Sequence, residues 1–170
     1  MPDEVILTNE RGERLGLMEK MQAHERGELH LAFSLFVFNS HEQLMLQRRA
    51  SSKYHAGGLW TNTCCSHPRA GETFEGAAHR RLREEMGFDC PLTEVGKIIY
   101  KAPVGDLIEH EYDVLFIGHY DGEPVLNSTE ADEWKWIDLD ALKEDVLARP
   151  HTYTPWLKII LAERGEIFLH

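Results

Sequence analysis

Residues 31–38 (Leu-Ala-Phe-Ser-Leu-Phe-Val-Phe) form an almost unbroken apolar run, which constrains the fold more than any other part of the chain. The run is short, rich in aromatic side chains and followed by Asn39 and Ser40. Such a run is typical of a strand that is buried on both faces. Residues 43–48 follow a polar turn, and we expect them to form the hairpin partner of this strand.

The N-terminal third and the middle of the chain carry further signals of secondary structure. Residues 3–18 predict a hairpin, and the polar, Gly-broken segment 18–30 is expected to be mainly loop. A helix is predicted at 74–86, because Thr73 is a good N-cap and Gly87 suits the position just after a helix.

The second half of the chain predicts more strands and two helices. Strands are expected at 95–100, 109–120 and 134–138. Asp140 is expected to cap a helix that runs to about Leu147, and Thr154 is expected to cap the last helix, with Pro155 as its first residue. Strands on both sides of a long helix, followed by terminal helices, predict an α/β sandwich with a mixed sheet.

Length, charge and cysteine content limit the class of protein. A chain of 170 residues fits one domain, predicted to span residues 1–170, and needs no disulfide or metal to bury a core. A net charge of −11 argues against binding to nucleic acid or to an anionic membrane. With three cysteines, no apolar run of transmembrane length and no signal-peptide pattern, a cytoplasmic protein with reduced thiols is expected.

Residues 60–68 (Trp-Thr-Asn-Thr-Cys-Cys-Ser-His-Pro) and the helix after them concentrate chemically active side chains. Cys65 lies two residues before His67, and the predicted helix ends with the adjacent acids Glu84 and Glu85. Two acids at a helix C-terminus oppose the helix dipole, and a bound cation would offset that cost. The segment therefore suggests chemistry on a metal-bound anion.

Five side chains are candidate ligands of a divalent ion. Glu109 and Glu111 are one residue apart in a predicted strand, so both carboxylates should point to one face. Three imidazoles and two carboxylates would suit Mn²⁺, Mg²⁺ or Zn²⁺. The proposed set is His24, His30, His67, Glu109 and Glu111. The alternative is that these are ordinary surface histidines in a chain that contains ten.

Cys65 has two possible roles as well. A lone cysteine is more often a small buried apolar residue than a reactive group. Polar residues surround Cys65 on both sides, which is a poor context for a buried strand, whereas Cys64 fits the inert role better. Cys65 is therefore the candidate thiol.

Three segments together resemble the type 1 isopentenyl-diphosphate Δ-isomerases, a branch of the Nudix superfamily. They are residues 60–68, Glu109-His-Glu111 and Thr154-Pro-Trp156, and the resemblance extends from about Val5 to the last helix. It implies a Nudix-type α/β/α sandwich and the conversion of isopentenyl diphosphate to dimethylallyl diphosphate. It also implies a prenyl diphosphate as the partner, with no nucleic acid and no membrane. A monomer is expected, with a dimer left open.

The resemblance implies roles for individual residues. Cys65 and Glu111 would be the acid/base pair, and the five candidate ligands would hold the first metal ion. Glu85 would help to hold a Mg²⁺ ion that meets the substrate diphosphate. The implied diphosphate-binding residues are Lys20, Arg49, Lys53 and Arg81, and the implied aromatic residues around the isoprenoid tail are Tyr100 and Trp156.

The helix departs from the Nudix pattern associated with hydrolysis, Gly-x5-Glu-x7-Arg-Glu-U-x-Glu-Glu-x-Gly-U, in which U is bulky and apolar. Ser66 replaces the leading Gly, and Arg81 replaces the Glu of the Arg-Glu pair. A cation in place of a metal-binding carboxylate suits gripping a diphosphate without cleaving it. The alternatives are a Nudix pyrophosphohydrolase acting on a diphosphate, and a non-catalytic binding module with the same fold.

Overall fold

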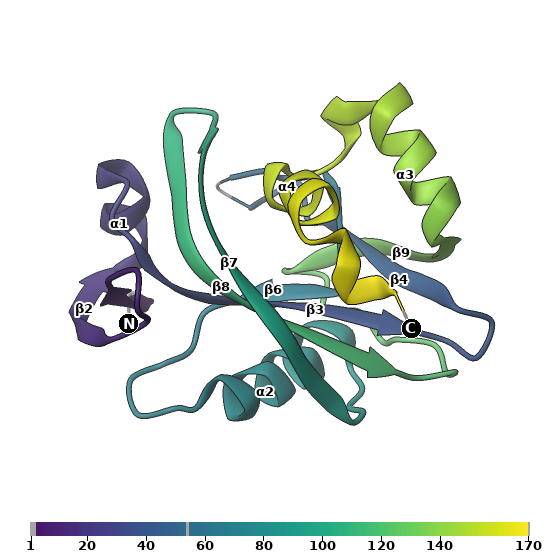
Figure 1. Ribbon diagram of the computed structural model, residues 1–170, viewed down its shortest axis with the longest axis horizontal. Coiled ribbons are helices and arrows are strands. Elements are labelled where there is room, and N and C mark those ends of the chain that lie inside the picture. Colours follow the sequence, from purple (N-terminus) through teal and green to yellow (C-terminus); the bar gives the residue numbers. More distant parts are fainter. Residues whose placement is uncertain (1–2, 54, 170) are drawn as a thin grey trace.

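The computed structural model describes residues 3–53 and 55–169, whose strands join in one mixed sheet (Figure 1). These strands are β1 (Glu4–Thr8), β2 (Arg14–Glu19), β3 (His30–Phe38), β4 (Gln43–Arg49), β5 (Trp60–Thr61), β6 (Cys64–Ser66), β7 (Leu92–Val104), β8 (Leu107–His119) and β9 (Ala131–Asp138). β3 and β8 run parallel in a register that pairs His30 with Glu111, whereas the other strand pairs of the described residues are antiparallel. The predicted mixed sheet is confirmed.

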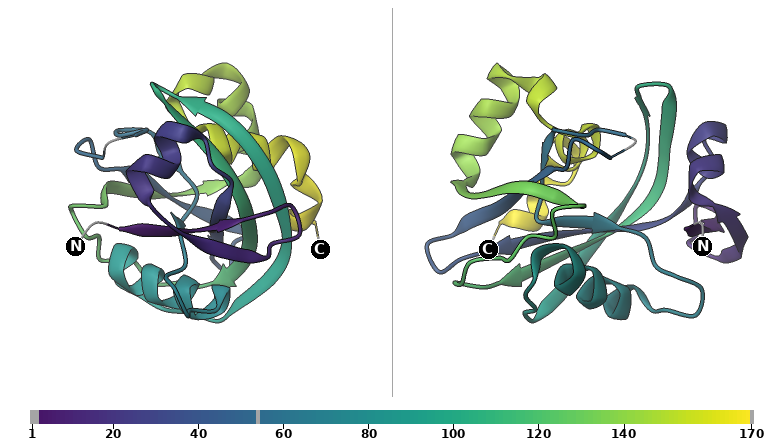
Figure 2. Two further views of the ribbon diagram at one scale, coloured as in Figure 1. Left: turned by 90° about the vertical axis from the view of Figure 1, so that its left-hand side faces the viewer. Right: turned by 180° about the vertical axis from the view of Figure 1, so that it is seen from behind.

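Helices cover both faces of the sheet. They are α1 (Lys20–Arg26), α2 (Phe74–Met86), α3 (Leu139–Ala148) and α4 (Pro155–Glu163), with 3₁₀ turns at Pro150–Thr152 and Gly165–Phe168. Figure 2 shows α2 on one face and α3 and α4 on the other. The predicted α/β/α sandwich is therefore confirmed. None of the helices in the described residues is long and apolar enough to span a membrane.

β3 supplies both halves of the core, as expected for a strand without an exposed face. All nine of its residues are buried. Successive side chains point to opposite faces, so Phe33 and Leu35 pack in the cluster beside α2, whereas Phe36 and Phe38 pack in the cluster beside α4. The predicted burial on both faces is confirmed.

The helix caps follow the sequence. Thr73 accepts a hydrogen bond from Gly76 N at the start of α2, and Gly87 ends that helix in the left-handed conformation at φ 70°. Thr154 accepts from Leu157 N at the start of α4. These three predictions are confirmed. The caps could be predicted because each depends only on local chain geometry.

Several predicted boundaries were wrong. The segment 18–30, expected to be mainly loop, contains α1, whose buried residues are only Ala23 and His24. Such a short helix leaves almost no apolar period to detect. The N-cap of α3 is Asp138 rather than Asp140, which lies in the first turn. The predicted hairpin of β3 and β4 is confirmed, although its strands share the single pair Phe38–Leu44 and β4 pairs over a greater length with β9.

Candidate active site

Strand alternation brings a line of acids to the α4-facing side of the sheet. Glu109, Glu111 and Asp113 precede the core residue Leu115 at steps of two along β8, so all four side chains share one face. The parallel register sets His30, the first residue of β3, beside Glu111. The polar group therefore lies near the start of both central strands.

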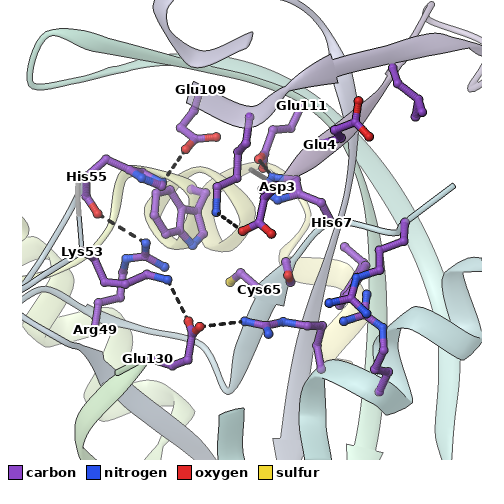
Figure 3. A pocket seen from close by; sticks show the side chains of 18 of the residues that line it. Asp3, Glu4, Arg49, Lys53, His55, Cys65, His67, Glu109, Glu111 and Glu130 are labelled. Carbon is purple, nitrogen blue, oxygen red and sulfur yellow. Dashed lines mark hydrogen bonds and ion pairs between the residues drawn. The ribbon is translucent and has the colours of Figure 1, made fainter. Parts of the chain in front are cut away.

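These side chains border a pocket of about 520 Å³ (Figure 3). Its lining comes from the N-terminal hairpin, the start of α1, the strands β3, β4, β6 and β8, the loops after β4 and β6, the segment before β9, α2 and α4. The residues that line it are Asp3, Glu4, Leu17, Lys20, Phe33, Arg49, Lys53, His55, Cys65, Ser66, His67, Arg69, Ala70, Arg80, Arg81, Glu109, Glu111, Glu130 and Trp156. Figure 3 shows Glu109 and Glu111 at one end, Lys53 and Glu130 toward the other, and Cys65 between them.

Imidazoles and carboxylates meet at the first end, which we call the histidine cluster (His24, His30, His67, Glu109 and Glu111). His24, His30, His67 and Glu111 form one compact group of potential ligand atoms, and Glu109 forms a second group with His24 and His55. The Nε2 atoms of His30 and His67 lie 3.3 and 3.0 Å from Glu111 Oε2, and His24 Nε2 lies 3.0 Å from Glu109 Oε1. Perpendicular ligands of an ion about 2.1 Å away would lie about 3 Å apart.

The backbone fixes which ring nitrogen can serve a metal ion. The Nδ1 atoms of His24 and His30 lie 2.8 and 2.9 Å from the carbonyl oxygens of Lys20 and Glu28, so each Nδ1–H must donate. In a neutral ring Nε2 then presents a lone pair to a carboxylate oxygen. Two acceptors repel unless a proton or a metal ion lies between them, so the donor set fits a divalent ion.

The pKa shifts within the histidine cluster also favour a cation at this site. Burial opposes the charged imidazole of His30, but the hydrogen bond and charge of Glu111 outweigh it and raise the pKa of His30. Burial lowers the pKa of His67 to about 4, despite its hydrogen bond to Glu111. Burial would raise the pKa of Glu111, but hydrogen bonds from His30 and His67 hold that pKa well below its usual range. Glu111 is therefore an anion.

Cys65 is a protonated thiol. Burial raises the pKa of Cys65 to about 12. The thiol donates to Asn62 Oδ1 at a distance of 3.0 Å, while Asn62 Nδ2 donates to Leu35 O and fixes the amide. β6 pairs with β3 so that Cys65 lies opposite Ser34. Cys64 is fully buried, which agrees with the inert role expected for it.

The other end of the pocket carries three cations and one acid; we call it the basic end (Arg49, Lys53, Arg81 and Glu130). Lys53 Nζ lies 2.7 Å from Glu130 Oε2. Arg81 lies 2.8 Å from Glu84, 2.8 Å from Glu85 and 3.3 Å from Glu130. Lys53 and Arg81 thus each have a carboxylate partner in this structure.

The contacts of the four other predicted binding residues, Lys20, Arg49, Tyr100 and Trp156, differ from these ion pairs. Lys20 lines it and lies 3.3 Å from Asp3. The guanidinium carbon of Arg49 lies 5.2 Å from the ring centre of Trp156. Tyr100, expected beside an isoprenoid tail, is buried, and its hydroxyl donates to Glu111 Oε1 at a distance of 2.5 Å.

Comparison with known proteins places the chain in a family. Residues 28–157 match the NUDIX domain model. The chain is 57% identical over 162 residues to isopentenyl-diphosphate Delta-isomerase 2 of Aromatoleum aromaticum, covering 95% of this chain and 86% of that protein. It is 48% identical over 162 residues to isopentenyl-diphosphate Delta-isomerase 2 of Photorhabdus laumondii, covering 95% and 92%.

The chain belongs to the isopentenyl-diphosphate Delta-isomerase family and carries a NUDIX domain. The resemblance drawn from the sequence is confirmed. Among solved structures, DR0079 from Deinococcus radiodurans has a TM-score of 0.77 at 19% identity, covering 94% of this chain and 98% of that one. At this identity the likeness concerns the fold alone.

Within this NUDIX domain, α2 shows what replaces the missing carboxylate. Arg81 stands where the hydrolytic pattern has Glu, and it binds Glu84 and Glu85, which that pattern retains. Glu85 is buried and also accepts a hydrogen bond from Gln47 Nε2 at 3.1 Å. The acids at the end of α2 are therefore neutralised by an arginine of the same helix.

Sequence reasoning missed three residues of the site. His55 Nε2 lies 2.7 Å from Glu109 Oε1, and Glu130 binds Lys53 and Arg81. Ser34 donates to buried Asp113, whose pKa burial and the charge of Glu111 raise well above its usual range. Each of the three residues had only a weak signal in the sequence. His55 is a histidine in a glycine-rich loop, Glu130 is an acid before β9, and Asp113 is an acid two residues after Glu111.

Proposed function

We propose that this protein interconverts isopentenyl diphosphate and dimethylallyl diphosphate, with Cys65 and Glu111 as the acid/base pair. Support comes from the names of its relatives and from one arrangement in the pocket. A protonated thiol and an ionised carboxylate both line the cavity, and cationic side chains lie beyond them. This combination suits moving a proton on a substrate that is held by its diphosphate.

The reaction needs one proton delivered and another removed. A proton added to C4 converts the C3–C4 double bond into a tertiary cation at C3, and loss of a proton from C2 then forms the C2–C3 double bond. Cys65 carries a proton to give, and Glu111 can accept one. Because the conversion is reversible, each group acts as acid in one direction and as base in the other.

Neighbouring side chains would tune this pair. The Tyr100 hydroxyl donates to Glu111 and so orients its carboxylate. Trp156 offers an aromatic face that would stabilise the cation at C3. In this structure the guanidinium of Arg49 lies near that ring, so the two cations would share the indole or Arg49 would turn toward the diphosphate.

The diphosphate would bind to Lys20 and to the cations of the basic end. Lys20, Arg49, Lys53 and Arg81 all line the pocket. Arginine offers parallel N–H groups that match phosphate oxygens, and lysine adds a mobile point charge. Binding there would exchange the carboxylate partners of Lys53 and Arg81 for phosphate oxygens. A Mg²⁺ ion brought by the diphosphate would take Glu85 as a ligand.

Residues of the histidine cluster would hold a second divalent ion, Mn²⁺, Mg²⁺ or Zn²⁺. Such an ion would supply positive charge that stabilises the Glu111 anion and lowers its proton affinity. The proposed ligands are His24, His30, His67, Glu109 and Glu111. His24 and His30 are fixed for this role by their Nδ1 hydrogen bonds.

The alternative is pyrophosphate hydrolysis. It is favoured by the acids that α2 retains, Glu84 and Glu85, and opposed by Arg81, which already binds both. A third possibility is a diphosphate-binding module without turnover. A protonated thiol and an ionised acid that line the same pocket have no use in either alternative.

One experiment separates the three functions. The metal-loaded protein is incubated with isopentenyl diphosphate and Mg²⁺ in D₂O, and the products are followed by NMR. Deuterium in dimethylallyl diphosphate supports isomerisation. Release of phosphate or pyrophosphate favours the hydrolase, and unlabelled, unconverted substrate favours the binding module. Cys65→Ala should abolish the labelled product while leaving the circular dichroism spectrum unchanged.

The cellular setting is proposed on separate grounds. Cys64, Cys65 and Cys90 are all free thiols, as in proteins of a reducing compartment. We infer that the protein acts in the cytoplasm. The monomeric state expected from the sequence stays a prediction, and size-exclusion chromatography with light scattering would test it.

A further inference from the structure

His55 places a fourth imidazole beside the histidine cluster. It lies in the loop between β4 and β5, and its side chain is 8% exposed. Its Nε2 lies 2.7 Å from Glu109 Oε1, the same oxygen that His24 Nε2 contacts at 3.0 Å. Figure 3 shows the ring pointing at the Glu109 carboxylate. His55 thus contacts a proposed metal ligand.

The geometry distinguishes a positioning role from direct ligation. His55 belongs to the compact group of His24 and Glu109, but not to the group of His24, His30, His67 and Glu111. One imidazole nitrogen has one lone pair, so His24 Nε2 can serve only one ion. The 2.7 Å separation matches a charge-assisted N–H···O hydrogen bond rather than the distance of about 3 Å between neighbouring ligands.

Glu109 has one oxygen held and one available. Its side chain is 2% exposed, and Oε2 is buried without a hydrogen-bond partner in the described part of the chain. A buried carboxylate oxygen left without a partner is costly, and a cation would remove that cost. We propose that His55 donates its Nε2–H to Glu109 Oε1, which orients the carboxylate so that Oε2 can bind the metal ion.

The loop is shaped to hold His55 in this place. Its carbonyl oxygen accepts a hydrogen bond from Arg49 Nη2 at 3.3 Å. Ala56 adopts the left-handed conformation at φ 54°, which is uncommon for a residue with a side chain. A Cβ on Gly57 would lie 2.8 Å from the Ser51 carbonyl oxygen, so only glycine fits there. The hydrogen bond from Arg49, a residue of the basic end, therefore helps to fix the backbone of His55.

This inference rests on the proposed metal site, not on the proton-transfer chemistry, and Mn²⁺ alone tests it. Metal-stripped full-length protein is titrated with Mn²⁺, and free Mn²⁺ is measured by electron paramagnetic resonance. We expect His55→Ala to weaken Mn²⁺ binding by about 10- to 100-fold, as is usual when a hydrogen-bond partner of a ligand is lost. His55→Gln, which can still donate to Glu109, should recover most of the affinity.

The matched control is His79→Ala. His79 lies on α2 beside Asp89, away from the pocket, and its loss should leave Mn²⁺ affinity unchanged. Unchanged affinity in His55→Ala would overturn the inference while leaving the metal site intact. A wild-type protein that binds no Mn²⁺ would overturn the site and the inference together.

A spectroscopic count of ligands separates positioning from ligation. Pulsed electron paramagnetic resonance of bound Mn²⁺ reports the nitrogen atoms coordinated directly. We expect the nitrogen couplings of wild type and His55→Ala to be the same, because His55 acts through Glu109. Loss of one nitrogen coupling in the variant would overturn the positioning role and make His55 a direct ligand.

Discussion

The two ends of the pocket differ in how their charged groups are paired. At the histidine cluster, the Nε2 atoms of His24 and His30 face the carboxylates of Glu109 and Glu111, and a proton or a metal ion is needed between these atoms. At the basic end, Lys53 and Arg81 are already paired with acids. One end must acquire positive charge, whereas the other must release negative partners before an anion can bind. Cys65 lies between the two ends (Figure 3).

The difference in charge between the two ends predicts how a metal ion and a diphosphate should bind. A cation entering the histidine cluster relieves repulsion between acceptors, so its binding should be tight and should not depend on substrate. A diphosphate at the basic end must replace the carboxylate partners of Lys53 and Arg81. Its affinity is therefore the free energy of binding to these cations, reduced by the free energy of the ion pairs that are lost. We therefore expect variants of the two ends to act on different measurements.

The largest effect is expected at the histidine cluster. Glu111→Gln removes both an acid/base group and a proposed metal ligand, so turnover should fall by at least about 10³-fold. The rate is measured with isopentenyl diphosphate. Glu133→Gln, on the exposed part of β9, is the control and should be fully active. More than a tenth of wild-type turnover in Glu111→Gln would contradict the assigned role.

Cys65, between the two ends, should behave as a thiol of raised pKa in the metal-free protein. With a pKa of about 12, its thiolate fraction at pH 8 is roughly 10³-fold below that of an ordinary cysteine. Alkylation by iodoacetamide should therefore be slower than that of an ordinary cysteine, and its rate should rise about tenfold per pH unit from pH 7 to 10. Peptide mass spectrometry measures the rate. A plateau below pH 9 would mean a much lower pKa.

At the basic end, Arg81→Ala should weaken binding of inorganic pyrophosphate by about 10- to 100-fold, because a charged and well-placed donor is lost. Isothermal titration calorimetry measures this affinity. Mn²⁺ affinity at the histidine cluster should stay within about twofold of wild type. Arg83→Ala, on the exposed side of the same helix, is the control. An equal loss of Mn²⁺ affinity in Arg81→Ala would show that the two ends are not independent.

The smallest effect concerns the acid that neutralises the basic end. Glu130→Gln leaves Lys53 and Arg81 with one carboxylate fewer, so pyrophosphate should bind about two- to fivefold more tightly. Glu123→Gln, on an exposed loop, controls for the change in net charge. Weaker binding in Glu130→Gln would mean that Glu130 orients the cations rather than competing with the anion.

The predictable parts of this molecule are those that depend on local periodicity. The Glu109–Glu111 spacing predicted a shared face, and Thr73 and Gly87 predicted the ends of α2. The placement of His30 beside Glu111 could not be derived from the residues alone, because it requires the parallel register of two strands that are far apart in the chain. The family resemblance supplied that pairing.

The parts that escaped prediction lack any periodic signal. α1 buries only Ala23 and His24, so its helix has no apolar stripe to detect. His55 lies in a loop whose course depends on the left-handed turn at Ala56 and the tight contact at Gly57. Such a loop is determined by the surface against which it packs, and that surface exists only in the folded chain.

The most direct test of the contrast between the two ends is the rate of isopentenyl diphosphate conversion by metal-stripped protein during stepwise addition of Mn²⁺. We expect almost no conversion at the start and a rate that rises as the histidine cluster fills, with His30→Ala failing to respond at the same Mn²⁺ concentrations. Conversion by the metal-free protein at the rate of the reloaded protein would contradict the claim that this end of the pocket requires a cation.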